Sequence, residues 1–230
     1  TGCVGCHEDR LAAPGQLPRP TTPLALQRAP HKMNGWRGPA RDFGFAAEVQ
    51  PVFDRCCVEC HDYEKPAGET LNLAADRGLV FNTAYAELWK KGYVRCPGAG
   101  PAEIQPANSW GARASPLFVE LLESTVEEHT ELDLTDEDLD RIATWLDLNG
   151  VYYPTYASAY PDSPTGRTPL SGEQFARLDQ LTGFNLGGAM SYNRCPGVLV
   201  SFDRPELSPC LTAIEDKASG AYAEALTIVR

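Results

Sequence analysis

A pentapeptide pattern that occurs twice, Cys-x-x-Cys-His, constrains this chain more than any other feature. Its residues are Cys3, Cys6 and His7 in the first copy and Cys57, Cys60 and His61 in the second. Two thiols at this spacing form thioether bonds to the vinyl groups of a haem, and the adjacent imidazole binds the iron. The sequence therefore predicts two covalently bound c-type haems, with His7 and His61 as iron ligands.

Two other uses of Cys-x-x-Cys pairs fit this chain less well. A zinc site built from two such pairs usually has them about 15–20 residues apart, whereas about fifty residues separate Cys6 from Cys57. A zinc site would also not require a histidine directly after both pairs. A thioredoxin-like redox motif needs a strand–helix context, which the residues around Cys3 do not offer. Haem attachment is the favoured interpretation.

The histidine count indicates how the other side of each iron is filled. Haem iron used for electron transfer normally has a second axial ligand, His or Met. His31 and His129 are the two histidines left over, and Met33 and Met190 are the two methionines. We expect His31 to bind some haem from an irregular, Pro-rich stretch. It could bind the first haem, with Met33 as a competitor, reach a haem of a neighbouring subunit, or bind no iron.

His129 is predicted to lie on a loop between two helices. The first begins at Ser115-Pro116 and turns four apolar side chains inward: Leu117, Phe118, Leu121 and Leu122. The second is capped by Thr135 and ends at Asn149-Gly150. From such a loop an imidazole can reach a haem edge, so we expect His129 to bind the haem held by His61. The alternative is an exposed loop histidine.

Four cysteines remain after haem attachment: Cys56, Cys96, Cys195 and Cys210. Attachment of c-type haem takes place outside the cytoplasm, where thiols are oxidised, so we expect a periplasmic or extracellular protein with two disulfides. Four cysteines allow three connectivities. Proximity favours Cys195–Cys210, which leaves Cys56 to pair with Cys96. The alternative is free buried thiols.

The net charge of −11 comes largely from one segment. Between Glu120 and Asp140 there are ten acidic residues and no Lys or Arg. This acidic segment is either a solvated surface or a docking surface for a basic redox partner, or for the slightly basic first fifty residues of another copy. Nucleic acid is not expected as a partner, and no run of about 18 apolar residues predicts a transmembrane helix.

Apolar periodicity and capping residues predict a mainly α fold with extensive irregular loops, in which cytochrome c-like helices pack around two covalently bound haems. Helices are expected over 45–60, 82–91, 115–122, 135–149 and 171–181 and from about residue 221, with a short strand over 198–202. We expect a loop-rich segment 1–44 with the first haem, a helical domain 45–155 with the second, and an extension 156–230. Thr1 is expected to be a processed or trimmed end.

Several stretches share residues with one known family. They are Val49–Arg55 with the motif that follows, Gly111–Leu117, His129, Trp145–Asn149, the opening Cys3–Arg10 and the late Phe202–Leu211. Together they resemble the cytochrome region of proteins related to the hydrazine synthase alpha subunit. The resemblance implies that His61 and His129 are both axial ligands of the second haem. It also implies a catalytic first haem with a tyrosine ligand soon after its motif, but here Leu11 stands four residues after His7.

These observations predict an extracytoplasmic di-haem c-type cytochrome, an electron-transfer protein rather than an enzyme. It would move electrons between its haems and to redox partner proteins. The basic start, the acidic segment and His31 also allow a filament in which copies of the chain stack haem to haem. The alternative function is a haem enzyme whose open first haem acts on peroxide or a small nitrogen compound.

Overall fold

The computed structural model of this chain describes residues 27–31, 36–97, 104–124, 126–158, 160–161, 167–189 and 197–230. The chain divides into two compact units, Thr1–Arg41 and Asp42–Arg230. Cys3, Cys6 and His7 lie outside the described residues, as does Cys195, so what the sequence predicts for them stays a prediction. His31 is described and is exposed.

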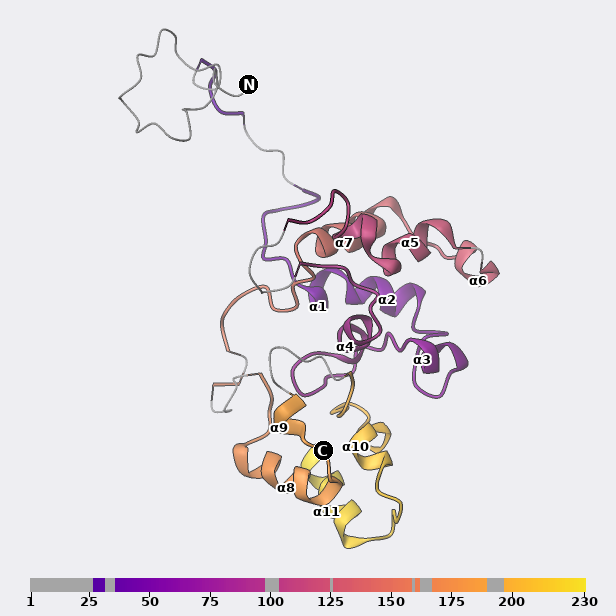
Figure 1. Cartoon of the computed structure of the whole chain (residues 1–230), viewed down its shortest axis with the longest axis vertical. Helices are drawn as coiled ribbons and strands as arrows, with labels where there is room; N and C mark the ends of the chain where they lie inside the picture. The colour runs from indigo at the N-terminus through magenta and orange to yellow at the C-terminus, as the bar shows by residue number, and fades with distance from the viewer. Residues whose placement is uncertain are drawn as a thin grey trace. The chain divides into compact units, whose positions relative to one another are not determined.

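Short helices joined by irregular loops make up the described part of the second unit (Figure 1). They are α1 (Phe45–Glu48), α2 (Gln50–Cys56), α3 (Pro66–Thr70), α4 (Thr83–Lys90), α5 (Pro116–Glu123), α6 (Glu127–Thr130), α7 (Asp136–Asp147), α8 (Gly172–Thr182), α9 (Leu186–Ala189), α10 (Pro209–Thr212) and α11 (Gly220–Val229), with 3-10 turns η2 (Ala112–Ala114) and η3 (Pro205–Leu207). The prediction of a mainly helical chain with irregular loops is confirmed. Of the helices described, none is long and apolar enough to cross a membrane.

The strand predicted over 198–202 is wrong, and across the described ranges the chain contains no strand. The segment is held by isolated hydrogen bonds instead of a ladder. The amide of Phe202 donates to the carbonyl of Arg77. The Oγ of Ser208 accepts from the amide of Ser201 and donates to its carbonyl. The Ser208 hydroxyl therefore makes the hydrogen bonds to Ser201 that a neighbouring strand would make in a sheet.

The helix predicted over 45–60 is split and ends earlier. α1 ends at Glu48, α2 runs from Gln50 to Cys56, and Val49 lies between them. Pro51 explains the break, because it has no N–H to continue the helix and is tolerated only in a first turn. The early end leaves residues 57–61 to form a turn of their own.

Side-chain caps begin three of the predicted helices. Asn82 accepts a hydrogen bond from a first-turn amide of α4. Thr135 and Ser171 form capping boxes at the starts of α7 and α8. Ser115 precedes α5 but does not cap it, because its Oγ donates to the carbonyl of Gly111 instead.

A first hydrophobic cluster joins α1, α2, α4, α5 and α7. Phe45, Phe53 and Trp145 are its largest fully buried side chains, and each is at most 1% exposed. The Trp145 indole donates to the carbonyl of Val151 at 3.0 Å, so its polar atom is satisfied inside the core. This cluster supports the helices that carry the candidate site.

A second hydrophobic cluster joins α8, α9, α10 and α11 near the end of the chain (Figure 1). Leu178, Leu186 and Leu211 are fully buried in it. Leu79, from the loop before α4, belongs to this second cluster rather than to the first. The last sixty residues therefore pack against a segment that follows the second Cys-x-x-Cys-His motif.

Candidate functional site

The second Cys-x-x-Cys-His motif forms a tight turn directly after α2. The carbonyl of Cys57 accepts hydrogen bonds from the amides of Cys60 at 3.1 Å and of His61 at 2.8 Å. The Cys57 amide donates to Phe53 in α2, so the turn is anchored to the buried helix. Cys60 is exposed and Cys57 is partly buried. Two thiols and an imidazole thus share one short, ordered piece of backbone.

A backbone carbonyl orients the ring of His61. Its Nδ1 lies 2.8 Å from the carbonyl oxygen of Leu71. The amide of Leu73 donates to the carbonyl of His61, also at 2.8 Å, so the loop returns to the motif at two points. Because a carbonyl oxygen can only accept, Nδ1 carries the proton and Nε2 carries the lone pair. Metal-binding histidines are commonly oriented by such a contact at the other ring nitrogen.

His129 lies on α6, a four-residue helix, rather than on an irregular loop. Its Nδ1 is 3.1 Å from Oε1 of Glu120 and 3.2 Å from Oγ of Ser124. A carboxylate accepts, so the proton is again on Nδ1 and Nε2 is free to bind a metal. The Ser124 hydroxyl and then the His129 ring hold the pKa of Glu120 below its ordinary value. Glu120 was predicted as part of the acidic segment, but not as the partner of His129.

The structure brings His61 and His129 together, with ring centroids 6.0 Å apart and ring planes at 33°. In the part of the chain that the structure describes, neither Nε2 atom has a hydrogen-bond partner. An imidazole nitrogen binds a transition metal at about 2 Å, and the ring centre lies about 1 Å behind it, so one ion between two histidines spaces their centres by about 6 Å. The residues present therefore fit an iron ligated from both sides.

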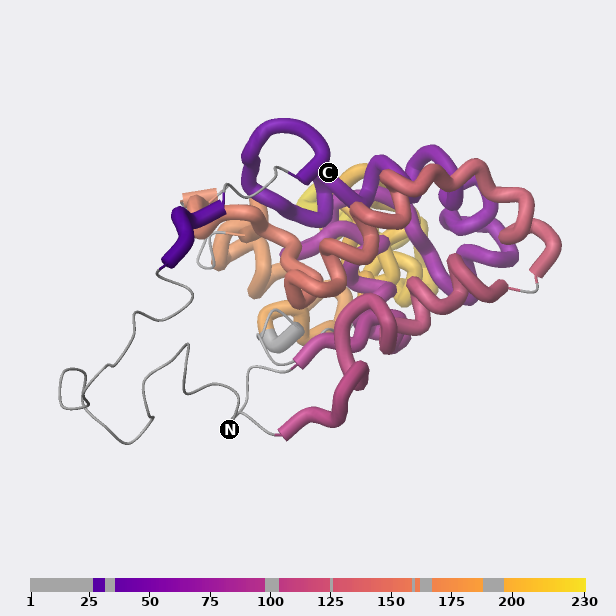
Figure 2. Tube along the Cα trace, turned by 90° about the horizontal axis from the view of Figure 1, so that it is seen from above, coloured from indigo at the N-terminus to yellow at the C-terminus, as the bar shows by residue number. Residues whose placement is uncertain are grey.

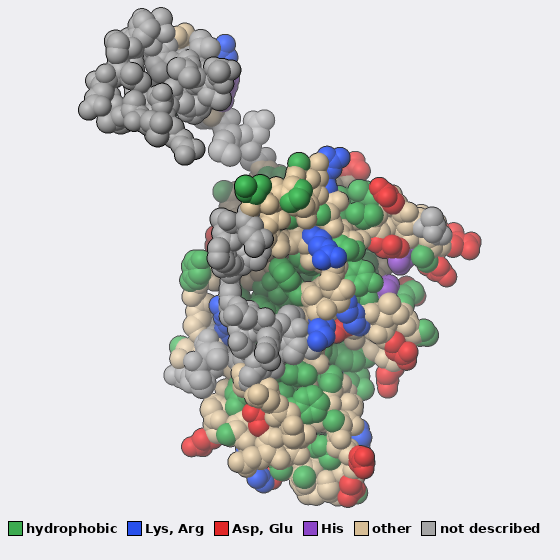
Figure 3. All heavy atoms as spheres, viewed as in Figure 1, with side chains coloured by type: hydrophobic (Ala, Val, Ile, Leu, Met, Phe, Trp, Pro, Cys, Tyr) green, Lys and Arg blue, Asp and Glu red, His purple; other side chains and the backbone are tan. Residues whose placement is uncertain are grey.

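The elements that carry the two histidines lie on the same side of this unit in both ribbon views (Figures 1 and 2). In the space-filling view, histidine side chains lie in a hollow between hydrophobic and acidic side chains (Figure 3). Leu122 was predicted to face inward, but it is 56% exposed. Val119 and Val126, on α5 and just before α6, are also exposed. The elements that present His129 thus leave apolar surface uncovered, which suits a large apolar group such as a haem.

The disulfide predicted between Cys56 and Cys96 is absent, and both are free thiols. The Cys56 thiol donates to the carbonyl of Asp133, before α7, whereas the Cys96 thiol donates to the carbonyl of Leu146, near the end of α7. The two thiols therefore bond to different segments, one before α7 and one near its end. Pairing these cysteines by elimination took no account of where each one lies in the fold.

Burial disfavours the thiolate form of three described cysteines. It raises the pKa of Cys57 to about 12 and that of Cys96 to about 11, so both are protonated at neutral pH. Burial likewise raises the pKa of Cys210, in the second hydrophobic cluster, to about 12. Within the described ranges, no group of three or more His, Cys, Asp or Glu gathers into a metal-binding cluster.

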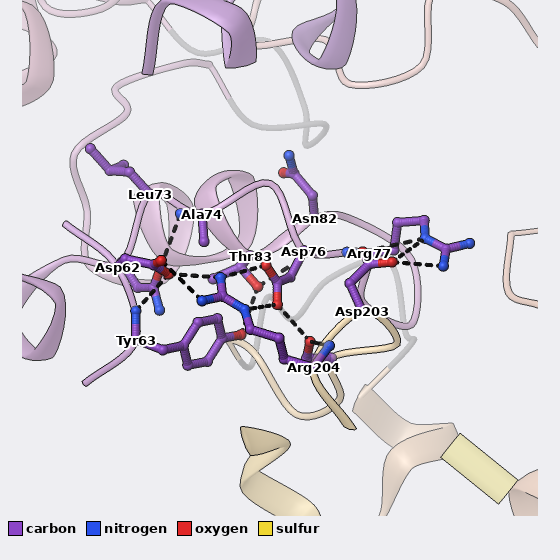
Figure 4. A network of polar contacts seen from close by, with 12 residues as sticks. Asp62, Tyr63, Leu73, Ala74, Asp76, Arg77, Asn82, Thr83, Asp203 and Arg204 are labelled. Atoms are coloured by element: carbon purple, nitrogen blue, oxygen red, sulfur yellow. Dashed lines mark hydrogen bonds and ion pairs between the residues drawn. The ribbon is translucent and has the colours of Figure 1, made fainter. Parts of the chain in front are cut away.

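An ion-pair network that sequence reasoning missed holds the residue directly after His61 (Figure 4). Arg204 donates to both carboxylate oxygens of Asp62, at 2.7 and 2.9 Å, and to both of Asp76, at 2.6 and 2.7 Å. Its guanidinium lies over the ring of Tyr63, 4.4 Å from the centroid. The hydrogen bonds that Arg204 donates to Asp76 and Asp62 outweigh burial and raise the pKa of Arg204 above its ordinary value. The only feature of the sequence that pointed to this network is the acidic residue that follows the histidine in both motifs.

Comparison of the chain with protein-family models, with curated proteins and with solved structures finds no match in any of the three. The functional argument therefore depends on the motif and on the geometry around His61 and His129.

Proposed function

We propose that this chain is a c-type cytochrome that carries two covalently bound haems and transfers electrons between them and to partner proteins. One observation carries the proposal: the ring centroids of His61 and His129 lie 6.0 Å apart, and each ring has its Nδ1 engaged and its Nε2 free. The second copy of the motif, at Cys3, Cys6 and His7, supports the other haem. The resemblance to the hydrazine synthase alpha-related cytochrome region is in keeping with this assignment.

A haem bound at the second motif would supply a one-electron iron couple, and the residues of this chain would hold it. Cys57 and Cys60 would anchor it covalently, and the imidazoles of His61 and His129 would both bind its iron. With two side chains as iron ligands, small molecules would have little access to the metal. The Leu71 carbonyl and the Glu120 carboxylate orient the two rings, which favours electron transfer with little rearrangement.

We further propose that redox partners dock near α6 through basic surfaces. Several acidic residues around it are exposed and make no ion pair within the described ranges: Glu123, Glu127, Glu128, Glu131 and Asp133. Such a surface attracts cationic partners from a distance, and added salt screens this attraction and shortens its range. Because c-type attachment requires an oxidising compartment, a periplasmic or extracellular location is part of the proposal, as is self-assembly through the basic start of another copy.

Visible and paramagnetic resonance spectra of the haem-loaded full chain test the proposal. We expect two covalent haems per chain and a low-spin second haem. His129→Ala is expected to convert one haem to high spin and to let it bind carbon monoxide when reduced, with haem content unchanged. Thr130→Ala, next to it on α6, is the matched control and should leave the spectra unchanged.

Two results would count against the assignment. A chain matured with the c-type attachment machinery that holds no covalent haem would overturn it. So would a His129→Ala variant in which both haems keep their original spectra. His31→Ala reports on the first haem, and a wild-type first haem that binds carbon monoxide readily would favour the enzyme alternative.

A further inference from the structure

Arg204 closes the loop that positions His61. Asp62 and Asp76 stand at the two ends of a segment that includes α3 and Leu71, and Arg204 binds both carboxylates at once (Figure 4). The carbonyl that accepts from His61 Nδ1 therefore belongs to a loop whose ends are held by one side chain from the last part of the chain.

The side chain of Arg204 is itself fixed on several sides. Its backbone amide donates to Oγ of Ser201, and the same hydroxyl donates to Oδ2 of Asp76 at 2.8 Å. The side chains of Asp76 and Asp62 are 9% and 23% exposed, so these ion pairs are partly shielded from water. Paired hydrogen bonds between a guanidinium and a carboxylate fix orientation as well as distance, unlike ordinary surface ion pairs.

We infer that Arg204 is a positioning residue for iron ligation at the second haem. By holding Asp62 and Asp76, it keeps the Leu71 carbonyl within hydrogen-bond distance of His61 Nδ1. The inference rests on the proposed function, since it assumes that His61 binds iron. It assigns the last part of the chain a role in the haem site, although Arg204 does not touch His61.

Two variants with opposite changes in charge test this role in the haem-loaded full chain. Arg204→Gln removes a positive charge, and Asp62→Asn removes a negative one, yet both break the link across the loop. If Arg204 positions the loop, both variants should let carbon monoxide displace a histidine from the reduced second haem about tenfold more readily, in line with the loss of metal affinity when a contact that orients a ligand is removed. Both should also lower the iron–histidine stretching frequency in a His129→Ala background, because that band reports the Nδ1 hydrogen bond.

Arg77→Gln is the matched control. The Arg77–Asp203 ion pair joins the same two parts of the chain, but it is exposed and does not bind the ends of the loop. The Arg77→Gln variant should leave carbon monoxide binding and the iron–histidine stretching frequency at their wild-type values. Arg204→Lys keeps the charge but not the paired hydrogen bonds, so it should behave like Arg204→Gln.

The outcomes are distinguishable. Opposite shifts in Arg204→Gln and Asp62→Asn would reveal a charge effect and overturn the positioning role, as would no shift in either. If Arg204→Gln fails to fold, the result for Asp62→Asn tests the positioning role by itself. This variant keeps the Arg204–Asp76 ion pair and removes only the contact at the other end of the loop. A wild-type chain without a haem ligated by His61 and His129 would overturn the proposed function as well. Unchanged variants of a correctly ligated chain would overturn the role of Arg204 alone.

Discussion

Glu120 and His129 form a hydrogen-bonded pair in which Oε1 of the carboxylate lies 3.1 Å from Nδ1 of the ring. The hydroxyl of Ser124 donates to the same oxygen at 2.6 Å and so holds the carboxylate in place. A carboxylate at the far nitrogen makes an imidazole a more basic ligand. If His129 binds iron as proposed, Glu120 is therefore the side chain through which this chain would tune that iron.

Replacing Glu120 with Gln is expected to raise the reduction potential of the second haem by roughly 30–60 mV, up to a tenfold change in a one-electron equilibrium. A less basic ligand stabilises ferric iron less, and this loss of stabilisation is larger for the ferric than for the ferrous state. Spectroelectrochemical titration measures the change. Glu123→Gln, at the end of the same helix and without a bond to His129, should shift the potential far less. Equal shifts in the two variants would argue against the hydrogen bond.

The exposed acidic residues of α6 are expected to lower the same potential through space. Replacing Glu127, Glu128 and Glu131 with Gln should raise it by on the order of tens of millivolts, because ferric haem is stabilised by nearby negative charge. The shift should shrink as salt is added, since exposed charges are screened. Glu173→Gln with Glu215→Gln, in the last part of the chain, is the control. A potential that does not rise in the α6 variant would contradict this expectation.

Gly68 is expected to be essential for the loop that returns to His61. A Cβ atom at this position in α3 would lie 1.8 Å from the carbonyl oxygen of Asp62. Gly68→Ala must therefore move the loop, at a cost of about 3 kcal/mol in the free energy of unfolding. Urea unfolding measures this cost. Gly220→Ala, with open space at its Cβ, should change stability little. Wild-type stability in Gly68→Ala would show that the contact is not present in solution.

Asp138 is expected to contribute stability at neutral pH that is lost in acid. Burial acts to raise its pKa, but hydrogen bonds from Arg55 and Thr135 outweigh it and hold the pKa below the ordinary value. A carboxyl whose pKa is lower in the folded than in the unfolded state stabilises fully above the unfolded value, about 4. This contribution disappears as the pH falls through the folded value.

Asp138→Asn should therefore lower the free energy of unfolding at pH 7 by about 1–2 kcal/mol, the range for a lost cap and charged hydrogen bond. The difference from wild type should narrow below pH 4. Urea unfolding across this pH range measures both effects. Asp136→Asn removes an exposed carboxylate from the same helical turn and should lack this pH dependence. A difference that stays constant with pH would contradict the assignment.

The helix starts were largely predictable from local sequence. Asn82, Thr135 and Ser171 cap helices as expected, because an N-cap bond joins residues two or three positions apart. The helix expected at Ser115-Pro116 also begins there, although the Ser115 hydroxyl bonds to Gly111 and not to α5. The expected strand is the error, and it came where distant partners compete: residues 198–202 bond to Ser208 and Arg77 instead.

The cysteines show the same limit of prediction from local sequence. Cys57, Cys60 and His61 lie in one turn, so spacing alone indicates what they do together. Cys56 and Cys96 were paired by elimination, but both are free thiols, and each bonds to a different backbone carbonyl. Spacing in the sequence predicts geometry within a turn, but it says nothing of distances across a fold.

The sequence by itself determined the motif that predicts covalent haem, the short list of candidate ligands, and the helical class, because each depends on residues close together in the chain. The tertiary structure decided which histidine lies beside His61, that Glu120 and the Leu71 carbonyl orient the two rings, and that Arg204 holds the loop that follows His61. These contacts join residues up to 142 positions apart. They form because burial of the two hydrophobic clusters folds those segments together.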